Sequence, residues 1–322
     1  MFTRPVIGAM TITIRPEDIY RQYQTDAKDP SELFGKAVEW INTIQQTSHT
    51  NENTVSKEIE DALVRAIYGS NMIERAGLGP EVTDFLCRKT FAGGNVEGID
   101  PLLELLYDLQ PDLKNRPVHH VLRGQYEIIQ HIKAYQHLLH AFVTENHDMT
   151  EDLIKETHRI LTENVPIIQE GFPDTPPQSY GGIYRSVVVG AGTTNFSVPR
   201  YVPSHMATMC NDLKEDLATT EKEQKIDPFS LAAKYSLQFV MIHPFQDGNG
   251  RMCRMILNAI LFRFAGIVIP IGEQEDEREE YMGIKRRASR DMEGHGEYAT
   301  FVLRKSVTRL RGMKKKLAGR RG

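Results

Sequence analysis

The 322 residues contain few sequence signals for disulfide bonds or for targeting. Its three cysteines, Cys87, Cys210 and Cys253, form no Cys-x-x-Cys pair, so no disulfide framework is expected. The first residues lack the apolar core of a signal peptide, because Arg4 and Pro5 interrupt it. A reducing, cytoplasmic location is therefore the expectation.

Long hydrophobic runs and a strong net charge are also absent. The most apolar stretch, residues 255–271, contains polar and charged positions and is too short to cross a bilayer. The net charge is −4, and residues 304–322 carry nine basic side chains and no acid, so an acidic body ends in a basic tail. Neither a membrane protein nor a nucleic-acid-binding protein is expected. Gly35-Lys36 lacks the surroundings of a P-loop.

Most of the sequence carries patterns that are typical of α-helices. With 40% hydrophobic residues, the chain is long enough to bury a substantial core. Asp29-Pro30 and Asp227-Pro228 each place a capping carboxylate before proline, which is typical of a helix start. Apolar residues recur at helical spacing in seven ranges: 33–44, 59–67, 102–109, 128–143, 153–161, 229–240 and 252–260.

One segment departs from the helical pattern. Residues 184–198 are rich in β-branched residues and glycine, which predicts a β-hairpin, and a loop rich in proline and glycine, residues 165–182, leads into it. The expected fold class is therefore mainly α, a helical bundle with one β-hairpin.

The most informative run is residues 243–254, His-Pro-Phe-Gln-Asp-Gly-Asn-Gly-Arg-Met-Cys-Arg, which joins two expected helices. Gly248, Asn249 and Gly250 tolerate positive φ and let the backbone approach a ligand closely. The free N–H groups at the start of the second helix favour an anion. The run therefore predicts an anion site at this helix junction.

Charged side chains in the run indicate what the anion is. Arg251 and Arg254 share a helical face and suit more than one phosphate. Asp247 would repel phosphate unless a divalent cation such as Mg²⁺ lay between them. His243 is the nearby group that can accept a proton near neutral pH. Together these residues predict metal-dependent phosphoryl or nucleotidyl transfer, although each feature alone also occurs in ordinary capped turns.

This run resembles the signature of the Fic (filamentation induced by cAMP) family, H-P-F-x-[D/E]-G-N-G-R-x-x-R, at every fixed position. Residues 182–190 resemble the family's flap, and residues 278–281 resemble the segment that approaches the nucleotide base. The resemblance covers about residues 124–310. It implies a Fic-type helical bundle that transfers AMP from ATP to a hydroxyl side chain of a target protein, and it implies homodimerisation.

The resemblance also implies roles for individual residues. His243 would be the general base that deprotonates a Ser, Thr or Tyr hydroxyl, and Asp247 would hold Mg²⁺, or Mn²⁺ in its place. The implied ATP-binding residues are Gly248, Asn249, Gly250, Arg251, Arg254 and Tyr281. The implied flap residues, which would pin the target by strand-like pairing, are Val187, Val188, Val189 and Gly190.

A second motif lies upstream of this run. Ser70 and Glu74 fit S/T-x-x-x-E, the family's inhibitory helix, which is expected at about residues 57–78. A spacing of four places both side chains on one helical face. Glu74 would then pair with Arg254 in a bidentate contact and occupy the anchor of the γ-phosphate. The resemblance thus implies an autoinhibited enzyme.

Three domains and three alternatives complete these expectations. We expect an N-terminal helical region at residues 1–120, a catalytic Fic domain at 121–310 and a basic tail at 311–322. One alternative is a hydrolase that removes AMP with Glu74 and His243. Another is a transferase with a different nucleotide-type donor, and a third is a nucleotide-binding scaffold without turnover.

Overall fold

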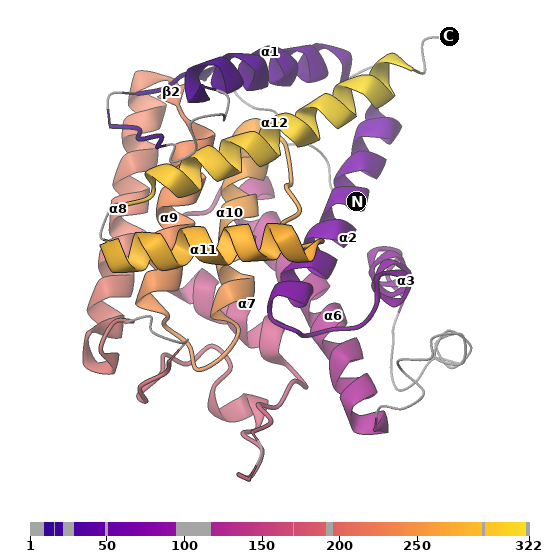
Figure 1. Cartoon of the computed structure of the whole chain (residues 1–322), viewed down its shortest axis with the longest axis vertical. Helices are drawn as coiled ribbons and strands as arrows, with labels where there is room; N and C mark the ends of the chain where they lie inside the picture. Colours follow the sequence, from indigo (N-terminus) through magenta and orange to yellow (C-terminus); the bar gives the residue numbers. More distant parts are fainter. Residues whose placement is uncertain are drawn as a thin grey trace.

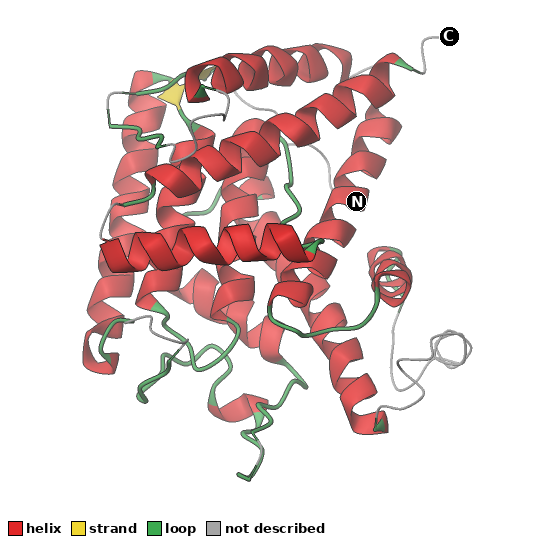
Figure 2. Ribbon diagram, viewed as in Figure 1, coloured by secondary structure: helices red, strands yellow, loops and turns green. Residues whose placement is uncertain are grey.

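The computed structural model describes residues 10–15, 17–21, 29–48, 51–94, 117–169, 171–190, 196–291 and 294–319. Helices dominate these residues, which confirms the mainly α fold class (Figure 2). The α-helices are α1 (Pro30–Ser48), α2 (Glu52–Ile73), α3 (Pro80–Phe91), α6 (Val118–Leu139), α7 (Glu151–Thr162), α8 (Val202–Glu223), α9 (Pro228–Ile242), α10 (Asn249–Ala265), α11 (Glu275–Asp291) and α12 (Gly296–Ala318). Shorter helical turns are η1 (His140–Thr144), η2 (Pro177–Ser179) and η3 (Pro199–Tyr201).

A small parallel sheet joins distant parts of the chain. Strand β1 (Thr11–Ile12) pairs with β2 (Lys225–Ile226), with Thr11 opposite Lys225. The pairing holds the beginning of the described chain against the connection between α8 and α9. Within the described ranges, each helix is too short or too polar to span a bilayer.

The helices form a layered bundle around α10. Helices α8, α9 and α10 lie side by side, and α11 and α12 cross them, with α1 along α12 (Figure 1). Helix α10 packs chiefly against α9 and also contacts α6 and α2. In Figure 1, α9 and α2 lie on either side of α10.

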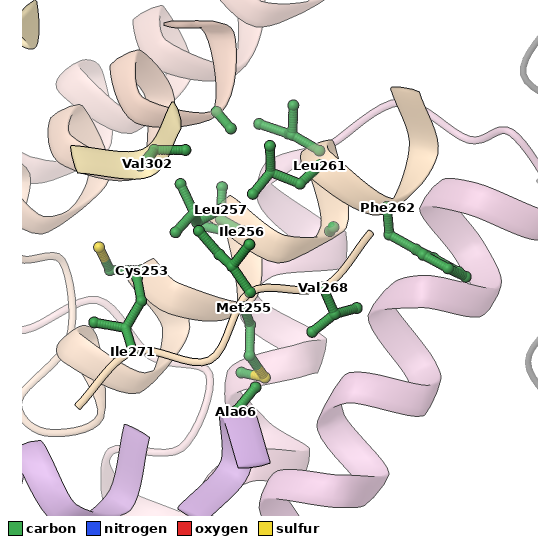
Figure 3. Packing of buried hydrophobic residues seen from close by; sticks show 14 of the residues in the cluster. Ala66, Cys253, Met255, Ile256, Leu257, Leu261, Phe262, Val268, Ile271 and Val302 are labelled. Carbon is green, nitrogen blue, oxygen red and sulfur yellow. The ribbon is translucent and has the colours of Figure 1, made fainter. Parts of the chain in front are cut away.

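The core is built around apolar side chains of α10. Met255 points toward Ala66 of α2, whereas Leu257 lies toward Val302 of α12, and all four are buried (Figure 3). Because apolar side chains leave α10 in several directions, neighbouring helices must cover all its faces. This packing fixes the position of the helix start, where the 243–254 run lies.

The predicted helix starts are confirmed. Asp227 accepts hydrogen bonds from the backbone N–H groups of Phe229 and Ser230, each at 3.0 Å, at the start of α9. Asp29 likewise accepts a bond from the N–H of Ser31 at the start of α1. Local capping chemistry thus determines where both helices begin.

Two expected elements and the expected tail need comment. Residues 183–190 and 196–198 form no strand, so the described parts of the expected hairpin are irregular; residues 191–195, its expected turn, lie outside the described residues. The helix expected at 102–109 also lies outside them. Residues 311–318, expected as a separate tail, are the last turns of α12.

Candidate active site

A tight loop between α9 and α10 carries the motif. Helix α9 ends at Ile242, and the next residue, His243, has a φ of 53° in the left-handed region. Gly248, with a φ of 78°, precedes α10. The Asn249 side chain closes the loop, because it accepts from the N–H of Phe245 at 2.9 Å and donates to its carbonyl at 2.8 Å. The Asn249 side chain therefore braces the loop, and the backbone of Asn249 lies at the start of α10.

His243 is held in the tautomer that a general base needs. Its Nδ1 lies 3.1 Å from the carbonyl of Val240, which can only accept, so Nδ1 carries the proton and Nε2 keeps a lone pair. The ring stacks on Phe196 with centroids 3.7 Å apart. Burial lowers the pKa of His243 to about 4, so the imidazole is neutral at physiological pH.

Arg185 ties the flap to this loop, a role that sequence reasoning did not assign. Its Nε donates to the carbonyl of His243 at 2.6 Å, and its backbone N–H donates to that of Pro244 at 2.9 Å. The guanidinium also donates to the backbone carbonyl of Val187 at 2.9 Å and to that of Ser197 at 2.5 Å. These carbonyls are therefore used by a side chain, which explains why the two segments do not pair as strands.

His158 of α7 braces the other side of the loop. Its Nε2 lies 2.9 Å from the carbonyl of Asp247, and its Nδ1 accepts the N–H of Gly182 at 2.9 Å. The ring stacks on Phe245 with centroids 3.6 Å apart. Burial lowers the pKa of His158 to about 4, so it is a neutral positioning residue. No local pattern marks this residue, because its partner lies 89 residues away.

Asp247 and Arg251 form the first charged pair. Nη2 of Arg251 lies 3.2 Å from Oδ2 of Asp247, whereas the buried Nε and Nη1 of Arg251 have no hydrogen-bond partner among the residues that the structure describes. Burial favours a neutral Asp247, but the charge of Arg251, the hydrogen bond from the Gly248 N–H and further nearby groups together outweigh it and lower the pKa of Asp247. No cluster of three metal-ligating side chains exists among the described residues. A metal here would thus need ligands from a bound phosphate, which suits Mg²⁺.

Arg254 is held by the end of α2. Its Nε donates to the hydroxyl of Ser70 at 2.9 Å, and its Nη2 donates to the Ser70 carbonyl at 2.9 Å. Nη2 also donates to Oε1 of Glu74 at 2.7 Å. The expected contact between Glu74 and Arg254 is therefore present, as a single hydrogen bond rather than a bidentate pair.

The Glu74 carboxylate lies against the first turn of α10. A Cβ atom at Gly250 would overlap Oε1 of Glu74, so only glycine leaves this space open. Burial opposes ionisation of Glu74, but Arg254 and then Arg251 outweigh it, and the pKa of Glu74 is lowered. A charged carboxylate thus occupies the position at the helix start that an anion favours.

The remaining expected site residues lie at the edges. Tyr281 is fully buried beside Tyr298 and Phe301. Its hydroxyl lies 3.5 Å from Nη1 of Arg254, and the guanidinium carbon of Arg254 lies 5.8 Å from the centroid of its ring. Val188 is 84% exposed on the flap. The flap positions Val187 and Gly190 are also exposed, whereas Val189 is partly buried.

Sequence comparison identifies the family. Residues 148–261 match the model of the Fic/DOC family. A Fido domain-containing protein from Dictyostelium discoideum is 36% identical over 109 residues, which are 34% of this chain and 72% of that protein. The chain belongs to the Fic/DOC family.

Two longer relatives carry functional names. Protein adenylyltransferase fic-1 from Caenorhabditis briggsae is 32% identical over 129 residues, which are 39% of this chain and 22% of that protein. Its namesake from Caenorhabditis elegans is 29% identical over 153 residues, or 47% of this chain and 27% of that protein. The chain thus matches about a quarter of the length of these curated relatives.

Solved structures share the fold over most of the chain. Fic-1 from C. elegans has a TM-score of 0.67 at 18% identity, covering 90% of this chain and 73% of the other. A Fic domain containing protein from Bacteroides thetaiotaomicron has a TM-score of 0.63 at 17% identity, covering 91% and 98%. These likenesses confirm the Fic-type helical fold.

Proposed function

We propose that this protein is an adenylyltransferase that moves AMP from Mg–ATP to a Ser, Thr or Tyr hydroxyl of a target protein, and that Glu74 restrains it. One observation carries the proposal: a charged carboxylate fills an anion site over Gly250, between two buried arginines and near a neutral histidine. The names of the nematode relatives support the same chemistry.

The residues can be given roles from their geometry. Nε2 of His243 would accept the proton of the target hydroxyl as its oxygen attacks the α-phosphorus. The bond from the α-phosphorus to the bridging oxygen would break, and pyrophosphate would leave. Arg251 has two buried donors without partners in the described ranges, and these donors suit phosphate oxygens, while Arg254 would orient the γ-phosphate. Asp247 would hold Mg²⁺, whose charge offsets that of the phosphates.

The restraint follows from competition for Arg254. The Glu74 carboxylate takes a donor that the γ-phosphate would use, and its charge repels phosphate over Gly250. A nucleotide that binds beside it would lack the anchor needed for in-line departure of pyrophosphate. Removing the carboxylate should therefore release activity.

The test uses α-labelled ATP with Mg²⁺ and compares wild type, Glu74→Gly and Glu74→Gly/His243→Ala. We expect covalent label on the protein, or on added lysate proteins, to rise at least about tenfold in the single variant and to vanish in the double variant. His147→Ala in the Glu74→Gly background is the matched control, because His147 is exposed. Absence of label in Glu74→Gly would overturn the proposed transferase.

A second candidate, hydrolysis of an AMP–protein bond, is favoured by one observation. Oε1 of Glu74 is held by Arg254, whereas no hydrogen bond reaches Oε2 from the described residues. Oε2 could therefore orient a water molecule for attack. In that case release of AMP from a modified protein would fall in Glu74→Gly, the opposite of the change expected for transfer.

A further inference from the structure

Lys285 lies beside the motif, although neither the motif nor the family resemblance includes it. It is on α11, four residues after Tyr281 and therefore on the same helical face. Its Nζ lies 3.1 Å from Sγ of Cys253, the residue before Arg254, and 4.3 Å from the centroid of the Tyr281 ring. The ammonium group thus reaches the first turns of α10 from the α11 side.

The ammonium lacks an adequate partner in this position. Thiol sulfur is a weak acceptor, and in the described part of the chain no carboxylate lies within ion-pair distance of Nζ. Lys285 is only partly exposed, so water cannot fully replace an anionic partner. Lys285 also lowers the pKa of both Glu74 and His243, which places its charge near the two ends of the site.

Charge balance indicates what the partner is. Arg251, Arg254 and Lys285 carry three positive charges at the start of α10, against the two negative charges of Glu74 and Asp247. This excess of positive charge suits a ligand that carries more than one negative charge in the same place. A polyphosphate satisfies that requirement, whereas a base or a ribose does not.

We propose that Lys285 is a phosphate-binding residue for the nucleotide: when ATP displaces the Glu74 carboxylate, the Lys285 ammonium leaves Cys253 and donates to a phosphate oxygen. This inference rests on the proposed function for the identity of the ligand. It adds a third cation, from α11, to the two arginines of the motif.

The test measures dissociation constants by calorimetry, with ATP and with inorganic tripolyphosphate, in the Glu74→Gly background. Lys285→Met should weaken binding of both ligands by about the same factor, roughly tenfold, because one charge-assisted hydrogen bond is lost. Lys285→Arg should retain most of the affinity. Arg286→Met is the matched control, because Arg286 is the exposed neighbour on the same helix.

Three outcomes would overturn the inference. They are unchanged binding of ATP by Lys285→Met, a loss for ATP without a loss for tripolyphosphate, and an equal loss in Arg286→Met. Thermal melting without ligand shows whether Lys285→Met is folded. Labelling of the same proteins with α-labelled ATP separates the two proposals. Binding of ATP through Lys285 without AMP transfer would contradict only the proposed function. AMP transfer together with normal ATP binding by Lys285→Met would contradict only this inference.

Discussion

At the scale of single residues, burial and neighbouring charge set the protonation of each site group. His243 is neutral because burial disfavours imidazolium, and Glu74 is charged because two arginines outweigh the cost of its burial. In the proposed reaction, the neutral His243 would accept a proton and the charged Glu74 would exclude phosphate from the anion site. Both properties can be tested separately.

The pH profile of the released enzyme tests the base. The neutral imidazole is the active form, so activity is lost as pH falls through its folded pKa, which is about 4. Removing Glu74 takes away a negative charge that raises this pKa, so the value in Glu74→Gly should be no higher. As the pH is lowered from 8 to about 6, we expect kcat/KM for transfer to stay constant. It should fall only near pH 4 to 5. Half-loss near pH 6.5 would contradict an unprotonated, buried His243.

Glu74→Gln separates the charge of the restraint from its volume. The amide keeps the size of the side chain and an acceptor oxygen, but a neutral acceptor binds Arg254 roughly half as strongly. The initial rate of labelling should therefore lie between those of wild type and Glu74→Gly. A rate equal to that of wild type would mean that steric blocking alone restrains the site.

At the scale of elements, Arg185 joins the flap to the loop that carries His243. Arg185→Met leaves the carbonyls of His243, Val187 and Ser197 without their donor. In the Glu74→Gly background we expect labelling to fall at least about tenfold, because each lost contact is worth roughly 1 kcal/mol. Calorimetry should show nearly unchanged ATP binding. Arg200→Met, at an exposed position, is the control. A loss of ATP affinity in Arg185→Met as large as its loss of labelling would contradict a role in positioning the flap.

Helix α2 is fastened to α12 at the end far from Glu74. Buried Glu58 of α2 lies 3.1 Å from Arg309 Nη1 and 2.6 Å from Lys316 Nζ, both on α12. Arg309→Met removes one of the two cations that pair with Glu58 and should weaken the packing of α2 against α12. Labelling by the otherwise wild-type chain should then rise, by less than in Glu74→Gly, and the melting temperature should fall. Arg311→Met on exposed α12 surface should change neither; labelling that stays at the wild-type level in Arg309→Met would contradict this coupling.

Elements with local signals could be predicted from the sequence, and elements fixed by distant contacts could not. Asp227 caps α9, whose first residue is the adjacent Pro228, so the start of α9 was predictable from two neighbouring residues. The segment around Arg185 was predicted to be a hairpin, because its composition gives no sign that a side chain would take its carbonyls. His158 and Lys285 were missed for the same reason, since each acts on residues far along the chain.

At the scale of the whole molecule, the proposed competition between Glu74 and nucleotide should affect thermal stability. A ligand at 100 times its dissociation constant adds about 2.7 kcal/mol to the free energy of unfolding. For a chain of this size that corresponds to a rise in melting temperature of roughly 4 °C. We expect this rise with Mg–ATP in Glu74→Gly/His243→Ala, which cannot modify itself, and a smaller rise in His243→Ala. Equal shifts in the two variants would contradict competition.

Because Glu74 belongs to the same chain as the site it fills, its effective concentration there is fixed by the fold. Under the restraint that we propose, dilution or overproduction of the protein would leave the fraction of restrained molecules unchanged. The output of a cell's pool of this protein would then scale with its abundance but never escape restraint through abundance alone. Under the same proposal, control would come from a change within each molecule, at α2 or at the anion site.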